Sequence, residues 1–264
     1  MSTVVLGATG KTGRRIVERL QARGVDVRGG SRSASPPFDW EAPETWEPAV
    51  RDADAVYISF YPDLAVPGAA EAVAEIARLA TSAQRIVLLS GRGEEEAQRA
   101  EQAVRDVFPA AAVVRCSWFA QNFSEGYLLE SVLAGEVALP VGDVREPFVD
   151  VDDIADVAVA ALTDDGHGGK VYELTGPRAL TFAEAVAEIA SATGRPVRFT
   201  RIEIDDLTAG VEDNDVAELM RYLFTEILDG RNVATADGVR RALGRPATNF
   251  HTFAARAATA GAWA

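Results

Sequence analysis

The sequence has very little of the residues that usually form disulfides and metal sites. Cys116 is the only cysteine, so no intramolecular disulfide can form, which is typical of a reducing compartment. The two histidines, His167 and His251, are not at the spacing of metal ligands, and no metal site is expected. We expect Cys116 to be a small buried apolar residue at a strand end, and both histidines to be structural or exposed.

Positive charge is also scarce. Lysines and arginines number 26 against 40 aspartates and glutamates, Lys11 and Lys170 are the only lysines, and the formal net charge is −14. This balance argues against nucleic acid or an anionic membrane as a partner, because both need a basic surface. An acidic chain that binds an anionic cofactor must therefore carry a local positive pocket.

Long apolar runs are absent. No stretch reaches the ~18 residues of a membrane span. The first three residues lead directly into an apolar strand, without the charged region and cleavage site of a secretory signal. We expect a cytoplasmic protein that acts on a small-molecule substrate as a monomer or homodimer.

Short β-branched runs alternate with helical patterns through the first half of the chain. Predicted strands cover 3–6, 25–30, 53–60, 85–90 and 111–115, and predicted helices cover 11–23, about 68–80 and about 94–107. Continuous apolar strands separated by helices are typical of a parallel sheet covered on both faces. Right-handed crossovers then give a doubly wound Rossmann sheet, so the predicted fold class is α/β.

The second half is less regular. A short strand and a helix from about Asp152 precede a strand in KVYELTG. A further helix has a capping box formed by Thr181 and Glu184 and ends at Gly194.

The domain organisation follows from this change of pattern. We expect residues 1–135 to form the dinucleotide-binding core, with 148–175 completing its sheet. Residues 176–264 are expected to form a smaller lobe for the substrate cleft. The 264 residues suit one large α/β domain with such a lobe.

Three glycines fall three apart near the start of the chain, in VVLGATGKTGRRI. Gly7 permits a tight turn after the first strand, Gly10 lets the backbone approach a pyrophosphate, and Gly13 lets the helix pack against the strand. The helix N-terminus then offers unpaired N–H groups and a positive dipole end to the phosphates. The strand before and the helix after favour a dinucleotide site over a glycine-rich turn without a ligand. The predicted cofactor-binding residues are Gly7, Thr9, Gly10, Lys11, Thr12, Gly13, Ser31, Arg32, Ser59, Phe60, Ser90 and Gly91.

The end of the second strand indicates which dinucleotide binds. An NAD site usually places a carboxylate there to bind the ribose hydroxyls. Here Ser31, Arg32 and Ser33 follow instead, and a guanidinium with hydroxyls suits a 2′-phosphate. Lys11 adds a second positive charge. We predict NADP(H) over NAD(H), with a solvated loop arginine as the alternative reading of Arg32.

Several longer motifs resemble one family. GATGKTGRRI, VRCSWFAQNF, EPFVDVDDIADVAVAAL and YELTGPRALTFAEAVAEI together resemble the NmrA-like atypical short-chain dehydrogenases/reductases. FDWEAPETW and the closing FHTFAARAATAGAW resemble the subgroup of the ergot-alkaloid reductases, of the festuclavine synthase and agroclavine dehydrogenase type. The resemblance covers nearly the whole chain.

The resemblance implies a Rossmann core that binds NADP(H) and a C-terminal lobe that forms the substrate cleft. Some members of the family reduce quinones, iminium ions or phenylpropanoid double bonds, and others bind the dinucleotide and report redox state. The predicted function is an NADPH-dependent reductase that transfers hydride to an iminium, quinone or related conjugated acceptor. The alternative is an NADP(H)-binding redox sensor or regulatory protein without catalysis.

The proton donor of ordinary short-chain dehydrogenases is missing. No tyrosine is followed four residues later by lysine, and LSGRGEEEAQRAEQ contains neither lysine nor histidine. This disfavours simple ketone reduction, because an alkoxide formed in a dry site needs a donor. Two acidic groups, 94–96 and the one formed by Asp150, Asp152 and Asp153, are assigned to the first turns of helices, where carboxylates are favourable, with acid–base work or Mg²⁺ binding as the alternative.

The remaining candidates lie at the expected carboxyl ends of the strands, where ligands bind in such sheets. Tyr61 is the candidate catalytic hydroxyl, with aromatic packing as the alternative. The candidate substrate residues are Arg92, Trp118, Phe119, Asn122 and Phe123. Their alternatives are an exposed loop residue for Arg92, core packing for the three aromatic residues and helix capping for Asn122.

Overall fold

The computed structural model describes residues 2–264, which form two compact units. The sheet unit contains the chain up to Cys116 together with Val151–Leu174 and Gly238–Arg245. The second unit contains Ser117–Asp150, Thr175–Asp237 and Pro246–Ala264. The chain therefore leaves the sheet unit and returns to it twice.

The sheet unit is built on one parallel sheet of six strands in the order β2-β1-β3-β4-β5-β8. The strands are β1 (Ser2–Leu6), β2 (Asp26–Gly30), β3 (Ala55–Ile58), β4 (Arg85–Gly91), β5 (Ala112–Cys116) and β8 (Val171–Leu174). The predicted parallel α/β sheet is confirmed. The order reverses between β1 and β3, and ligands of such sheets bind at the carboxyl ends of the strands at this switch point.

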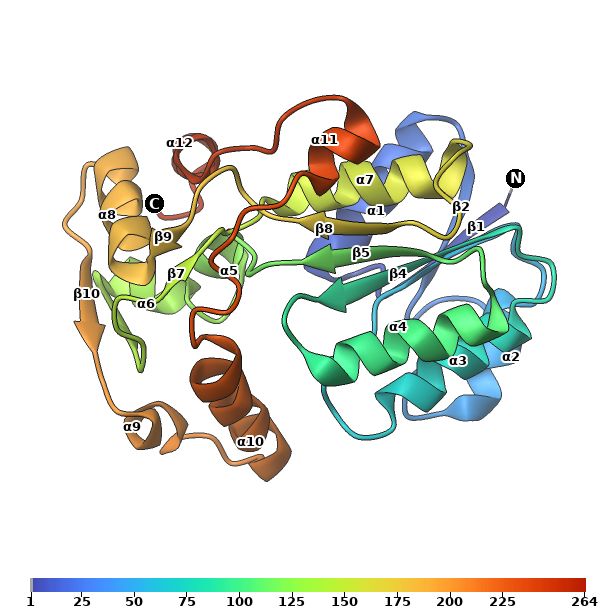
Figure 1. Cartoon of the computed structure of the whole chain (residues 1–264), viewed down its shortest axis with the longest axis horizontal. Coiled ribbons are helices and arrows are strands. Elements are labelled where there is room, and N and C mark those ends of the chain that lie inside the picture. The colour runs from blue at the N-terminus through green and yellow to red at the C-terminus, as the bar shows by residue number, and fades with distance from the viewer. Residues whose placement is uncertain (1) are drawn as a thin grey trace. The chain divides into compact units, whose positions relative to one another are not determined.

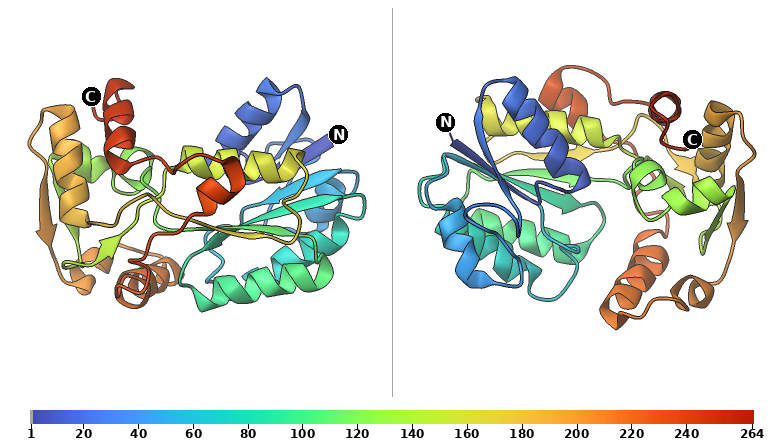
Figure 2. Two further views of the ribbon diagram at one scale, coloured as in Figure 1. Left: turned by 45° about the horizontal axis from the view of Figure 1, so that its top comes forward. Right: turned by 180° about the vertical axis from the view of Figure 1, so that it is seen from behind.

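Helices cover both faces of this sheet, as a doubly wound fold requires (Figure 1). One layer contains α1 (Lys11–Ala22), α7 (Val151–Thr163) and α11 (Gly238–Leu243), and the other contains η1 (Pro43–Thr45), α2 (Trp46–Val50), α3 (Ala69–Leu79) and α4 (Glu95–Val107). Figure 2 shows the two layers from two further directions. Strand β3 is fully buried between them, and the middle of β4 is buried too, which explains their apolar sequences.

The second unit has short strands and a core rich in aromatic rings. Its strands form two pairs, β6 (Glu136–Leu139) parallel to β10 (Arg198–Arg201) and β7 (Arg145–Glu146) antiparallel to β9 (Leu180–Thr181). Its helical segments are α5 (Asn122–Glu125), α6 (Leu129–Ala134), α8 (Phe182–Thr193), α9 (Ile204–Thr208), α10 (Asn214–Tyr222), η2 (Leu223–Ile227) and α12 (Phe250–Thr259). The predicted capping box of α8 is confirmed, because Thr181 and Glu184 cap each other's backbone N–H groups.

Candidate functional site

The glycine loop connects β1 to α1, and its backbone explains the three glycines. Gly7 has a φ of 76°, in the left-handed region that favours glycine. The Gly10 N–H donates a hydrogen bond of 2.9 Å to the Gly7 carbonyl oxygen, and a Cβ on Gly13 would lie only 2.1 Å from that oxygen. Gly10 itself is exposed, so its backbone is accessible to a ligand.

The N-terminus of α1 has the chemistry of an anion site. No side chain caps its N–H groups, and its first turn contains no acidic residue. Lys11 is half-buried and forms no ion pair within residues 2–264. Burial, and then the charges of Arg14 and Arg15, lower the pKa of its ammonium group. Thr9 is exposed in the loop, whereas Thr12 is buried.

The carboxyl end of β2 lies against this loop. A Cβ on Gly29 would lie 2.8 Å from the Cβ of Ala8. Ser31 and Ser33 follow, with their hydroxyl oxygens 3.3 Å apart, and the side chain of Arg32 is exposed between them. In the described part of the chain, Arg32 pairs with no carboxylate.

The predicted residues after β3 separate into two groups. Ser59 lies against the glycine loop, because a Cβ on Gly7 would be 3.3 Å from the Ser59 Cβ. Phe60 packs on Trp40, with ring centroids 4.7 Å apart. Tyr61 is 77% exposed, so its ring packs into no core.

The predicted residues after β4 belong to a buried network of charges. The Ser90 hydroxyl donates a hydrogen bond of 2.6 Å to Glu101 Oε1, and Arg115 pairs with the same carboxylate. Arg115 also reaches Glu173 at 2.9 Å, and Arg92 donates to that carboxylate at 3.3 Å. Ser90 and Arg92 are therefore already engaged within the sheet unit.

The predicted substrate residues of the second unit are close together in its aromatic core. Trp118 packs on Phe182 and Phe224, with centroids 5.8 and 5.3 Å apart, but keeps a partly exposed side chain. Phe119 and Asn122 are also partly exposed. Phe123 is fully buried among other rings, so its side chain packs the core and presents no surface to a substrate.

Two carboxyl groups lie near one another at the carboxyl edge of the sheet: Glu94, which the sequence singled out only as part of the acidic group 94–96, and Asp63, which it did not single out. Asp63 lies in the loop after β3, and Glu94 immediately precedes α4. Burial raises the pKa of Glu94 most strongly, and the neighbouring Asp63 raises it further. The only signal in the sequence is that glutamate is a poor N-cap residue compared with aspartate or serine.

The other singled-out polar residues have structural partners. Asp152 pairs with Arg15 and Arg19, while Asp150 and Asp153 each pair with a different arginine. Cys116 is buried, as expected, and burial raises the pKa of its thiol. His167 Nδ1 lies 2.8 Å from the Tyr172 hydroxyl, and His251 is exposed. Among residues 2–264, no group of histidines, cysteines and carboxylates could hold a metal.

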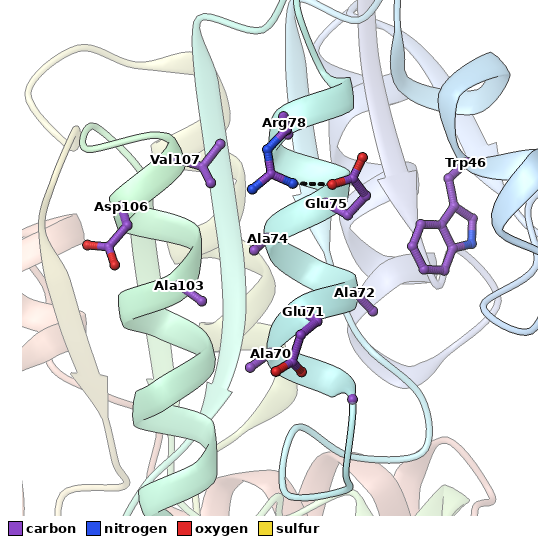
Figure 3. Close-up of a pocket in the computed structure, with 11 residues that line it drawn as sticks. Trp46, Ala70, Glu71, Ala72, Ala74, Glu75, Arg78, Ala103, Asp106 and Val107 are labelled. Atoms are coloured by element: carbon purple, nitrogen blue, oxygen red, sulfur yellow. Dashed lines mark hydrogen bonds and ion pairs between the residues drawn. The ribbon is translucent and has the colours of Figure 1, made fainter.

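A pocket of about 670 Å³ lies along α3 and α4 (Figure 3). Its wall consists of alanines with a few charged residues, and the Glu75 carboxylate pairs with Arg78 on the same helix. This groove holds no nucleophile or acid–base pair, so we do not assign the chemistry to it. No helix in the described chain is both long and apolar enough to cross a membrane.

Comparison with known proteins identifies relatives over almost the full length. The chain is 32% identical to the uncharacterized oxidoreductase YesF of Bacillus subtilis, over 96% of this chain and 93% of that protein. It is 29% identical to the NAD(P)H azoreductase of Xenophilus azovorans, over 98% and 99% of the two chains. No family model matches the sequence.

Several solved structures and fungal enzymes are also similar to this chain. The triphenylmethane reductase of Citrobacter sp. in complex with NADP(H) superposes with a TM-score of 0.75 at 21% identity, covering 98% of this chain and 100% of that chain. The regulator NmrA shares the fold, with a TM-score of 0.73. Festuclavine synthases and dehydrogenases and agroclavine dehydrogenase from Penicillium roqueforti, Aspergillus fumigatus and Claviceps fusiformis are 25% to 28% identical, which confirms the resemblance noted from the motifs.

Proposed function

This chain belongs to the NmrA-like atypical short-chain dehydrogenases/reductases, and from that membership we propose that it reduces a small, conjugated or cationic organic acceptor with hydride from NADPH. It is an NAD(P)H-dependent oxidoreductase, as its named relatives are. The acceptor class is a quinone, an iminium ion or a related conjugated molecule. These acceptors share a delocalised or positively charged centre that receives electrons easily.

The observation that carries the proposal is the uncapped, positively charged start of α1 behind a tight glycine turn. A pyrophosphate fits this site, because backbone N–H groups and Lys11 offer it hydrogen bonds and charge. Ser31 and Arg32 would hold the 2′-phosphate, since no carboxylate stands after β2 to compete with it. When NADPH is bound, its reduced nicotinamide ring supplies the hydride.

Each unit, taken by itself, has residues suited to contact with a conjugated acceptor. On the sheet unit, the exposed Tyr61 offers a ring and a hydroxyl. On the second unit, Trp118 and Phe119 offer partly exposed aromatic faces, and Asn122 offers an amide. The partly exposed rings of Trp118 and Phe119 would suit a flat conjugated acceptor, because aromatic faces can stack on it and orient it. The azoreductase and triphenylmethane reductase relatives are named for conjugated substrates.

NADPH oxidation, followed by absorbance, tests the proposal directly. The purified full-length protein is given a panel of quinones, cyclic iminium ions, azo dyes and free flavin, with NADH run alongside NADPH. We expect turnover with at least one conjugated class and a preference for NADPH. Tight NADPH binding without turnover across the panel would contradict a reductase and favour a nucleotide-dependent binding module.

A further inference from the structure

A pair of acidic side chains occupies the carboxyl edge of the sheet unit, in the loops that follow β3 and β4. Asp63 comes from the first loop and Glu94 from the second, and the two carboxyl groups lie near enough for Asp63 to raise the pKa of Glu94. Both loops flank the part of the sheet where ligands of doubly wound folds bind.

Glu94 is buried, but its side chain does not cap the helix that follows it. Its side chain is only 7% exposed, it stands at the N-cap position of α4, and it accepts no hydrogen bond from the helix. Its Oε2 atom is buried and has no hydrogen-bond partner among the described residues. A buried carboxyl oxygen without a hydrogen-bond partner is unfavourable in free energy. We therefore expect a proton or a ligand to satisfy it.

Gly91 provides the space that this carboxyl group fills. A Cβ on Gly91 would lie 2.1 Å from Glu94 Oε1, and its φ is not in the left-handed region. Glycine is therefore needed at position 91 for room and not for backbone conformation. The absence of a side chain at the end of β4 allows the carboxyl group to lie directly over the strand end.

Within residues 2–264, neither Asp63 nor Glu94 forms an ion pair with a lysine or an arginine. The nearby Arg92 guanidinium is directed to Glu173, and the Ser90 hydroxyl is directed to Glu101. The Ala65 N–H donates a hydrogen bond of 2.8 Å to Asp63 Oδ1, which favours the ionised form of Asp63. Burial raises the pKa of both carboxyl groups, and the charge of Asp63 raises that of Glu94 further, so Glu94 is the group we expect to keep a proton.

We propose that the Glu94–Asp63 pair, holding one proton, is the acid that protonates the reduced acceptor. The inference rests on the proposed reductase function and fills the place of the missing tyrosine and lysine. Hydride from NADPH reduces the acceptor by two electrons, leaving NADP⁺ and an anionic oxygen or nitrogen on the acceptor. The O–H bond of the pair then breaks, and an O–H or N–H bond forms on the reduced product. Water returns the proton to the pair.

This chemistry distinguishes two kinds of acceptor. A quinone or azo compound becomes anionic when it receives hydride and needs a proton. An iminium ion is already cationic and becomes a neutral amine, so it needs none. A proton donor should therefore matter for the first kind only, whereas a residue that merely supports the fold should matter for both.

The test compares Glu94→Gln with Glu95→Gln, a matched control at the exposed neighbouring position. We expect E94Q to lower the rate of quinone and azo reduction about 10²-fold, a typical contribution of a general acid. For E94Q, the rate of reduction of a preformed iminium ion and the dissociation constant of NADPH should both lie within about 2-fold of the values measured for E95Q. Equal loss with all acceptors, or no loss with quinones, would overturn the proposal.

A measurement without turnover makes the test independent of the acceptor. Carbon-13 NMR of protein labelled at the glutamate carboxyl carbons should show one glutamate that stays protonated at neutral pH, and its signal should vanish in E94Q. Gly91→Ala should lower the pKa of that glutamate by displacing it toward water. Titration of every glutamate in the ordinary range would overturn the proposal even if E94Q fails to fold.

The two proposals can fail separately. A protonated Glu94 in a protein that reduces nothing would refute the reductase function and, with it, the donor role, while leaving the buried acid established.

Discussion

The Tyr57 hydroxyl on β3 donates a hydrogen bond of 2.9 Å to Thr12 Oγ1 in the first turn of α1, with both side chains buried. This bond crosses the switch point of the sheet, because β3 and α1 stand on either side of it. The strand thus fixes the start of the helix whose N–H groups face the proposed pyrophosphate position. Burial also raises the pKa of Tyr57 well above its ordinary value, so the hydroxyl remains a donor at every physiological pH.

Tyr57→Phe should cost about 1 kcal/mol of unfolding free energy, because it leaves the buried Thr12 hydroxyl without its donor. It should also weaken NADPH binding several-fold by loosening the start of α1. Urea unfolding and NADPH titration by fluorescence measure the two effects. Tyr172→Phe is the matched control, since it removes the hydrogen bond with His167 and should leave NADPH binding unchanged. Equal affinities in both variants would contradict a positioning role for Tyr57.

Gly13→Ala should abolish tight NADPH binding. The new methyl group would lie 2.1 Å from the backbone oxygen of Gly7, so the loop or the helix must move. We expect at least a 100-fold rise in the dissociation constant together with a lower melting temperature. Gly210→Ala is the control, because a Cβ there meets nothing within 4 Å. If Gly13→Ala binds NADPH as the wild type does, the glycine loop is not the pyrophosphate site.

Arg32→Ala should weaken NADPH binding by about 1–3 kcal/mol and leave NADH binding nearly unchanged, as expected for the loss of a charged hydrogen bond to the 2′-phosphate. Arg51→Ala removes another exposed arginine of the sheet unit and serves as the control. Both dinucleotides are titrated against each variant. Equal losses for NADPH and NADH would remove Arg32 from the 2′-phosphate site.

Local patterns account for most of what the sequence predicted correctly in the fold. The inner strands of the sheet unit are mostly apolar because both faces of the sheet are covered, and the helices between them have one apolar face. Apart from the short strand expected before Asp152, near which β7 lies, the strands of the second unit escaped prediction because they are two to four residues long. Their partners are far away in the chain, as with Glu136 beside Arg198, so only the tertiary fold pairs them.

The candidate site, too, has a part that local sequence patterns predict and a part that they do not. The glycine loop could be predicted because one short segment contains the turn, the strand and the helix. Glu94 was assigned to the first turn of a helix, which is what its neighbours in the sequence indicate. Its burial depends on Asp63 in another loop and on the missing side chain of Gly91, and no local pattern contains that combination.

The stability of the protein should fall with rising pH because of Glu94. Burial and Asp63 raise the pKa of Glu94 from 4.5 to about 9. Between these values the folded protein keeps a proton that the unfolded chain has lost, so the stabilisation present below pH 4.5 is lost as the pH rises toward 9. Relative to E94Q, the wild type should lose up to about 1.4 kcal/mol of unfolding free energy per pH unit in this window. Urea unfolding from pH 5 to about 9 measures the difference, E95Q should follow the wild type, and parallel profiles of wild type and E94Q would contradict a raised pKa.

Arg115→Met should destabilise the sheet unit more than any other substitution considered for it. Glu101 is 4% exposed and relies on Arg115 and Ser90 for its hydrogen bonds. Removing the guanidinium leaves a buried carboxylate without its cation, which typically costs 3–5 kcal/mol, or roughly ten times an exposed ion pair. The double variant Glu101→Gln/Arg115→Met should recover a large part of this loss, because the uncompensated charge is gone. Urea unfolding of the two single variants and the double variant completes the cycle. If the losses of unfolding free energy in the two single variants add up to the loss in the double variant, the two side chains act independently. Ser90 at the strand end would then not be held by a charged network.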